Sequence, residues 1–212
     1  MKFINRGLRN SLFLSLLLSV FLFTGCSQKQ SNMETESLSI EKKRKAIVAN
    51  ALKYLNTKEG RDCSGLVALV NTENGEPYYK TKKLSNHFSN DYRSKAIYNV
   101  MKSDERIAKK QSPKIADLVF FSDTLEKTKR KVGAENITHI GIVTQVDRDG
   151  TVHFIHNIRG KNVIGVLNEK YPKIANKENK NINTYLKRCE PSRSKYECLS
   201  PYFLSAYGEI ER

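Results

Sequence analysis

One cysteine in this chain stands in a context suited to nucleophilic catalysis. Cys63 lies in the stretch GRDCSGLVALV, between small or charged residues and an apolar run whose spacing predicts a buried helix face. Asp62 or Ser64 can cap that helix, which places Cys63 at or just before its first turn. The partial positive charge of a helix N-terminus favours a thiolate, so Cys63 is a candidate nucleophile. A structural cysteine in a core helix is the alternative.

Two histidines are candidates to act on that thiol. His139 opens one predicted strand, and His156 lies near the end of the next, with the hairpin signal Asp149-Gly150 between the strands. The start of one hairpin strand lies beside the end of the other, so the two imidazoles can approach each other. One would then orient the other toward the thiol. Considered alone, each histidine is more often a partly buried structural residue than a catalytic one.

The elements that must hold these residues follow a simple order. Apolar spacing predicts helices in the first half of the domain, and short β-branched and aromatic runs predict strands in the second half. This order indicates an α+β domain with N-terminal helices packed on an antiparallel sheet. The predicted helices cover 41–55, the Cys63 stretch, 94–101 and 104–109, and the predicted strands cover 116–122, 138–146, 151–157, 162–167 and 202–209.

The first 25 residues resemble a bacterial lipoprotein signal peptide. Basic residues precede an apolar run over 11–23 that is too short to span a bilayer comfortably, and small residues come directly before Cys26. Cys26 would then carry the lipid and become the first mature residue, whereas an ordinary secretory signal or an uncleaved anchor is the alternative. The polar stretch 26–40 predicts a flexible tether, which leaves 41–212 as the catalytic domain.

The export signal and the charge together indicate a protein of the bacterial cell envelope. The formal net charge of +15 over 212 residues favours anionic partners such as the cell wall or anionic lipid. Neither zinc-finger spacing nor an aromatic RNA-binding motif accompanies the lysines, so we expect no nucleic-acid partner. We expect a monomer tethered to the membrane by its N-terminal lipid, at the outer membrane facing the periplasm if the cell is Gram-negative.

Four blocks of sequence, in order, resemble the NlpC/P60 family: DCSGLV at 62–67, ADLVFF at 116–121, THIGIV at 138–143 and FIH at 154–156. The resemblance implies a papain-like α+β fold and a cysteine peptidase that cleaves the γ-D-glutamyl–diamino acid bond of peptidoglycan stem peptides. It implies no cofactor and no metal. It assigns the nucleophile to Cys63, the general base to His139 and the orienting role to His156.

The chain departs from that family just before Cys63. Many members carry a Tyr-x-Trp-Gly-Gly stretch whose tyrosine helps the oxyanion site, whereas this chain has Asn-Thr-Lys-Glu-Gly at 56–60. Tyr54 is the candidate to substitute for that tyrosine, at a different spacing from Cys63. Two other functions stay open: a catalytically decayed lipoprotein that binds the cell wall, and an amidase or acyltransferase on the same fold.

Cys189 and Cys198 lie nine residues apart in a chain with an export signal. An oxidising compartment favours an intrachain disulfide between them. Two free thiols or a metal pair are the alternatives, although no histidine lies near them to complete a metal site. We favour the disulfide, which leaves Cys63 unpaired.

Overall fold

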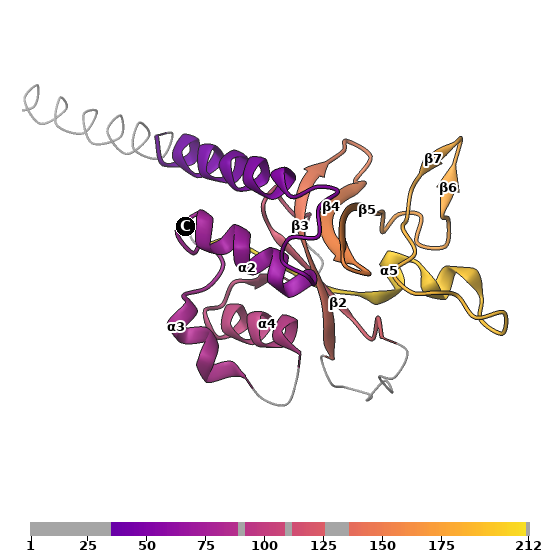
Figure 1. The fold of residues 1–212 in the computed structure, drawn as a ribbon. Helices are drawn as coiled ribbons and strands as arrows, with labels where there is room; N and C mark the ends of the chain where they lie inside the picture. The colour runs from indigo at the N-terminus through magenta and orange to yellow at the C-terminus, as the bar shows by residue number, and fades with distance from the viewer. Residues whose placement is uncertain (1–34, 89–91, 109–111, 126–135, 211–212) are drawn as a thin grey trace, which may run out of the picture. The chain divides into compact units, whose positions relative to one another are not determined.

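The computed structural model of the chain describes residues 35–88, 92–108, 112–125 and 136–210 (Figure 1). The chain divides into two compact units, Met1–Lys43 and Arg44–Arg212. The predicted signal peptide and the predicted lipidation site Cys26 lie outside the described residues. Within the described ranges, no helix combines the length and the apolar character needed to cross a membrane.

A six-stranded sheet forms the centre of the unit Arg44–Arg212, in the strand order β1-β8-β2-β3-β4-β5. All of its neighbouring strands are antiparallel. The strands are β1 (Ile107–Ala108), β2 (Leu118–Ser122), β3 (Ile137–Val146), β4 (Val152–Ile158), β5 (Lys161–Leu167) and β8 (Leu204–Gly208). A small separate hairpin pairs β6 (Asn176–Lys177) with β7 (Lys180–Asn181). Helices combined with an antiparallel sheet confirm the predicted α+β class.

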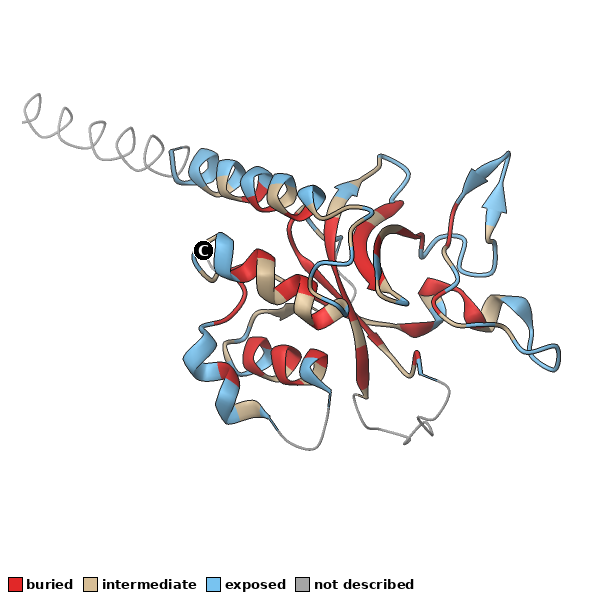
Figure 2. Cartoon of the chain, in the orientation of Figure 1, coloured by how far each residue is buried: buried red, intermediate tan, exposed pale blue. Residues whose placement is uncertain are grey.

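The two longer helices of this unit, α2 (Cys63–Glu73) and α4 (Arg93–Ser103), both pack against β3. A further helix covers residues 35–53, of which 44–53 belong to this unit. The short helices are α3 (Thr81–Leu84), η1 (Ser85–His87), η2 (Lys195–Cys198) and α5 (Ser200–Phe203). Figure 2 shows that the buried residues run along α2, α4 and the central strands.

The two faces of the sheet bury separate apolar clusters, because successive strand residues point to opposite faces. Leu118 and Phe120 of β2 join the cluster that includes the apolar residues of α2 and α4. Val119 and Phe121, which alternate with them, join a second cluster with Phe154 of β4 and with residues of the C-terminal segment. The strands are therefore covered on both sides.

A buried ion pair anchors the start of β2. Arg44 Nη1 lies 2.6 Å from Asp117 Oδ1 and donates to the carbonyl oxygen of Ile115 at 2.7 Å. The other carboxylate oxygen of Asp117 accepts from the backbone N–H of Lys114 at 2.8 Å. The aspartate of the ADLVFF block is therefore structural, since it ties the helix over 44–53 to the sheet.

Two expectations about local structure were wrong. Residues 107–108, placed in a predicted helix over 104–109, instead form β1, because Ile107 and Ala108 pair with Gly208 and Tyr207 of β8. Residues 35–40, placed in the flexible tether, are helical. No glycine or proline occurs between 27 and 40, so nothing in that stretch stops the helix from starting before residue 41.

Candidate active site

Cys63 is the first residue of α2, as the capping pattern predicts. Asp62 is the N-cap: its Oδ1 accepts from the backbone N–H of Gly65 at 2.8 Å and from the Ser64 hydroxyl at 2.8 Å. This cap leaves the first backbone N–H groups of the helix free to face the sulfur of Cys63. The thiol is half-buried and is not part of a disulfide.

Two glycines allow the preceding loop to cross the first turn of α2 at close range. A Cβ atom on Gly65 would lie 1.9 Å from the carbonyl oxygen of Gly60, and one on Gly60 would lie 2.4 Å from the backbone nitrogen of Leu66. Gly60 also has a φ of +81°, which glycine adopts without strain. The glycines on either side of Cys63 therefore fix the direction in which the chain enters the helix.

A buried asparagine holds that loop to the sheet. Asn162 of β5 is fully buried, and its Nδ2 donates to the carbonyl oxygens of Tyr54 at 3.1 Å and Glu59 at 3.0 Å. Its Oδ1 accepts from Asn157 Nδ2 at 2.8 Å. Sequence reasoning missed Asn162. A polar residue inside an otherwise apolar strand was the signal that could have pointed to it.

The two predicted histidines meet, as the hairpin requires. His139 Nε2 of β3 lies 2.8 Å from His156 Nδ1 of β4, and the two ring planes are nearly perpendicular at 82°. The His139 ring packs against Phe121, and the His156 ring against Phe154, with centroids 6.0 Å and 4.9 Å apart. His156 is fully buried, whereas His139 is half-buried.

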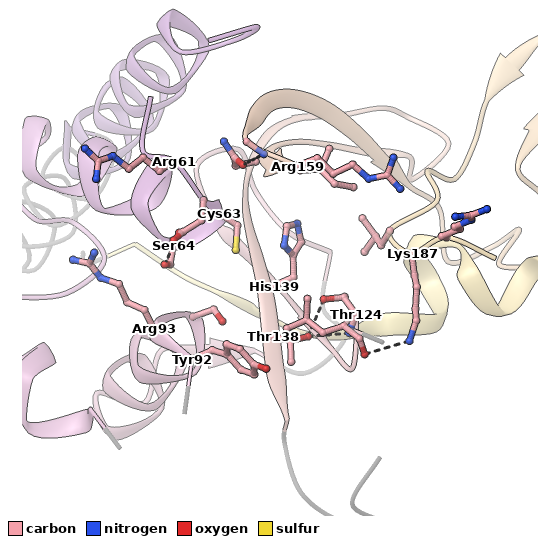
Figure 3. Close-up of a pocket in the computed structure, with 18 of the residues that line it drawn as sticks. Arg61, Cys63, Ser64, Tyr92, Arg93, Thr124, Thr138, His139, Arg159 and Lys187 are labelled. Atoms are coloured by element: carbon pink, nitrogen blue, oxygen red, sulfur yellow. Dashed lines mark hydrogen bonds between the residues drawn. The ribbon is translucent and has the colours of Figure 1, made fainter. Parts of the chain in front are cut away.

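Cys63 and His139 line the same open cavity, whose volume is about 1030 Å³. Figure 3 labels both Cys63 and His139 among the residues that line that cavity. No hydrogen bond joins the two side chains among the described residues. A catalytic hydrogen bond can be absent from a ligand-free site and form only when substrate binds.

Burial keeps the thiol and both imidazoles uncharged at neutral pH. It raises the pKa of Cys63 to about 11, against the opposing effect of the backbone N–H groups of Ile140, Ser64 and Cys63 itself. Burial lowers the pKa of His139 to about 4 and that of His156 well below its usual range. The resting site therefore holds a neutral thiol beside a neutral base rather than a thiolate–imidazolium pair.

This neutral state predicts how the thiol reacts with an alkylating reagent. Since the thiolate is the reactive form, we expect the iodoacetamide rate at Cys63 to keep rising with pH until about 11. The measurement uses the full chain with Cys26→Ser, in which Cys63 is the only cysteine outside the Cys189–Cys198 disulfide. A rate that levels off below pH 8.5 would show that a thiolate is already present.

The base role of His139 requires a particular placement of the protons on the histidine pair. For His139 Nδ1 to accept the thiol proton, His139 Nε2 must carry a hydrogen and donate it to His156 Nδ1. His156 then carries its own hydrogen on Nε2, a buried atom with no hydrogen-bond partner among the described residues. A Cβ atom on Gly165 of β5 would lie only 3.0 Å from His156 Nε2, so a glycine at this position avoids crowding that nitrogen.

Tyr54 is not brought to the nucleophile, contrary to its assignment as an oxyanion helper. Its hydroxyl donates to Glu73 in the last turn of α2, and this bond raises the pKa of Tyr54 to about 12. Tyr54 is not among the residues that line the cavity. The hydroxyl is held instead at the far end of α2 from Cys63, where Glu73 accepts its hydrogen bond.

Cys189 and Cys198 form a disulfide with a Cα–Cα distance of 5.5 Å, and Cys189 lines the cavity. The other two histidines lie elsewhere: His153 contacts Asp147 at 3.1 Å, and His87 belongs to η1. Within the described ranges, no group of three or more histidine, cysteine, aspartate or glutamate residues is arranged to hold a metal ion.

Protein-family models, curated proteins and solved structures offer no match to this chain. Support for a function therefore lies in the site itself: a thiol at a helix start that shares an open cavity with one of two paired imidazoles.

Proposed function

We propose that the chain is a cysteine peptidase with a papain-like NlpC/P60 fold that hydrolyses the γ-D-glutamyl–diamino acid bond of peptidoglycan stem peptides. The observation that carries the proposal is the shared cavity of Cys63 and His139, with His139 Nε2 bonded to His156 Nδ1 at 2.8 Å. The four sequence blocks around these residues support the choice of substrate. The sequence of the first 26 residues supports a lipid anchor at Cys26 and a location at the cell envelope.

The proposed reaction has two steps. His139 Nδ1 takes the proton of the Cys63 thiol while the sulfur attacks the carbonyl carbon of the scissile amide. The tetrahedral intermediate collapses to a thioester, and the amine leaves with the proton from His139. A water molecule then gives a proton to His139 while its oxygen attacks the thioester carbon. The C–S bond breaks to release the acid, and the sulfur takes the proton back from His139.

The start of α2 supplies the oxyanion donors in this scheme. The backbone N–H groups of Cys63 and Ser64 interact with the sulfur, so they lie near the place where the carbonyl oxygen of a bound amide would gain charge. In this scheme the backbone donors bind the oxyanion without the Tyr54 hydroxyl. The raised pKa of the thiol makes the base essential, because almost no thiolate is present at pH 7 before His139 acts.

The test is product analysis with the full chain in detergent. Disaccharide-peptides from purified peptidoglycan are incubated with wild type, Cys63→Ala and the control Cys26→Ser, and the products are identified by mass spectrometry. Wild type and the control are expected to release fragments that begin at the diamino acid, and Cys63→Ala to release none. Equal products from wild type and Cys63→Ala would refute the nucleophile, and a cut at the sugar–peptide amide would indicate an amidase.

A second candidate is a cell-wall-binding lipoprotein without hydrolytic activity. Two observations favour it: the raised pKa of the Cys63 thiol, and the absence of Tyr54 from the cavity. The same experiment separates the two functions. Co-sedimentation with insoluble peptidoglycan, together with no product from wild type, would support binding alone.

A further inference from the structure

We propose that two cationic subsites flank Cys63 and that they recognise a carboxylate on each side of the scissile bond. This inference rests on the proposed function and deepens it, because it says which form of the stem peptide the site prefers. The cations that line the cavity are Arg61, Arg93, Arg159, Lys187 and Arg188, and the one acidic residue among the lining residues is Asp62.

The cations come from separate segments and lie on opposite sides of the nucleophile. In Figure 3, Arg61 and Arg93 lie on one side of Cys63 and His139, with their guanidinium groups at the outer end of that side, whereas Arg159 and Lys187 lie on the other. Arg61 precedes α2 and Arg93 begins α4; we call this pair the first subsite. Arg159 is in the turn between β4 and β5, and Lys187 and Arg188 precede the disulfide at Cys189; these three form the second subsite.

The positive charge of both subsites is available to a ligand. No ion pair in the part of the chain that the structure describes includes any of the five cations. Lys187 Nζ donates to the carbonyl oxygen of Leu125 at 3.2 Å, which leaves two of its three hydrogens for a ligand. Asp62 is the one carboxylate among the lining residues, and its Oδ1 accepts from the Ser64 hydroxyl and the Gly65 N–H, so five cations face a single negative charge.

A generally basic surface does not account for this arrangement. Lysine outnumbers arginine 25 to 12 in the chain, yet four of the five cavity cations are arginine. The planar guanidinium group binds a carboxylate through two parallel hydrogen bonds, which lysine cannot do. Charges of one sign along a cleft also raise the local concentration of an oppositely charged substrate.

The stem peptide of the proposed function carries suitable groups on both sides. The glutamyl residue has a free α-carboxylate next to the scissile γ-amide, and the diamino acid carries a carboxylate on the amine side. A site with cations on both sides is therefore expected to prefer the peptide with free carboxylates over peptides in which either carboxylate is amidated.

The test combines charge-removing variants with three forms of one synthetic peptide, L-alanyl-γ-D-glutamyl-diaminopimelate. The first form has free carboxylates, the second is amidated on the glutamyl residue, and the third is amidated on the diamino acid. The variants are Arg61→Gln with Arg93→Gln, and Arg159→Gln with Lys187→Gln. The control removes the same charge at the exposed lysines 82 and 114, neither of which lines the cavity: Lys82→Gln with Lys114→Gln.

Equilibrium binding is measured on the full chain carrying Cys63→Ala, so that the peptide is not consumed. Each cavity variant is expected to weaken binding of the free peptide about tenfold, and the control to change it less than twofold. Amidation on one side should weaken binding to the unmodified cavity by a similar factor. It should have no further effect in the first-subsite variant, which lacks both cations on that side, and a smaller effect in the second-subsite variant, which keeps Arg188. This loss of the amidation effect is the signature of a direct pair.

The outcomes are separable from those for the proposed function. Cavity variants that match the lysine control, or amidated peptides that bind as well as the free peptide, would overturn the two subsites even if wild type cleaves the peptide. A wild-type chain that binds with the expected charge dependence and cuts nothing would overturn the peptidase and leave the subsites in place. Thermal unfolding of each variant checks that the charge-removing substitutions, all at exposed residues except the half-buried Lys187, leave the fold unchanged.

Discussion

Replacement of His139 by alanine is expected to lower kcat for stem-peptide hydrolysis by about 10³- to 10⁴-fold. The loss is large because the pKa of the Cys63 thiol is raised to about 11, so the folded chain holds almost no thiolate at pH 7 and the proposed reaction depends on His139 for proton removal. Initial rates at several peptide concentrations give kcat and KM separately. A fall of less than tenfold would mean that the thiol loses its proton by another route.

The role of His156 as a positioning residue makes a different prediction. His156→Leu fills the same buried space without an acceptor for His139 Nε2, and it is expected to lower kcat about 100-fold with KM nearly unchanged. His156→Asn keeps an amide oxygen near the position of Nδ1 and is expected to recover part of that loss. Equal kcat values for the two variants would show that His156 acts only through packing.

Short sequence patterns correctly predicted the two parts of the site that depend on neighbouring residues, the helix start at Cys63 and the histidine hairpin. The cap at Asp62 and the start of α2 at Cys63 depend on residues within one turn of each other, so a single stretch of sequence contains the necessary information. The meeting of His139 and His156 depends on one hairpin, whose turn sequence predicts the antiparallel pairing. These predictions needed no knowledge of distant segments.

Two of the failures, at β1 and at Tyr54, involve contacts with residues outside the local stretch. Ile107 and Ala108 form a strand because β8, about 100 residues later, offers a free edge. Tyr54 turns away from Cys63 because Glu73, at the other end of α2, accepts its hydroxyl. Secondary-structure propensity and residue spacing do not predict such pairings, because tertiary contacts can override the local preference of a segment.

The cationic subsites could not be predicted from the sequence, because they too depend on contacts between distant segments. Arg61, Arg93, Arg159 and Lys187 come from segments that are up to 126 residues apart in the sequence and stand among many other basic residues. Only the arrangement of the loops around the cavity separates them from the rest of the surface. The net charge of +15 indicated an anionic partner but not where it binds.

The buried histidine pair is expected to make the fold sensitive to acid. An unfolded histidine titrates near pH 6.5, whereas the pKa of His139 in the folded chain is lowered to about 4 and that of His156 lies well below 6.5. Between these values the unfolded chain binds protons that the folded chain does not. The free energy of unfolding therefore falls as the pH drops below about 6.5, by up to about 1.4 kcal/mol per pH unit for each histidine, and is unaffected by this pair at higher pH.

Histidine variants separate the contribution of the histidine pair to the pH dependence of stability from the contribution of the carboxylates. Urea unfolding at pH 7, 6 and 5 is expected to show a shallower loss of stability in His156→Leu than in wild type, with a slope lower by up to about 1.4 kcal/mol per pH unit. His87→Gln, which removes a histidine outside the cavity, should retain the wild-type slope. NMR titration of the imidazole protons gives a second measurement that does not depend on the stability of a variant. A wild-type His156 signal that titrates at or above pH 6.5 would contradict the neutral pair, and with it the proton arrangement on which the base role of His139 depends.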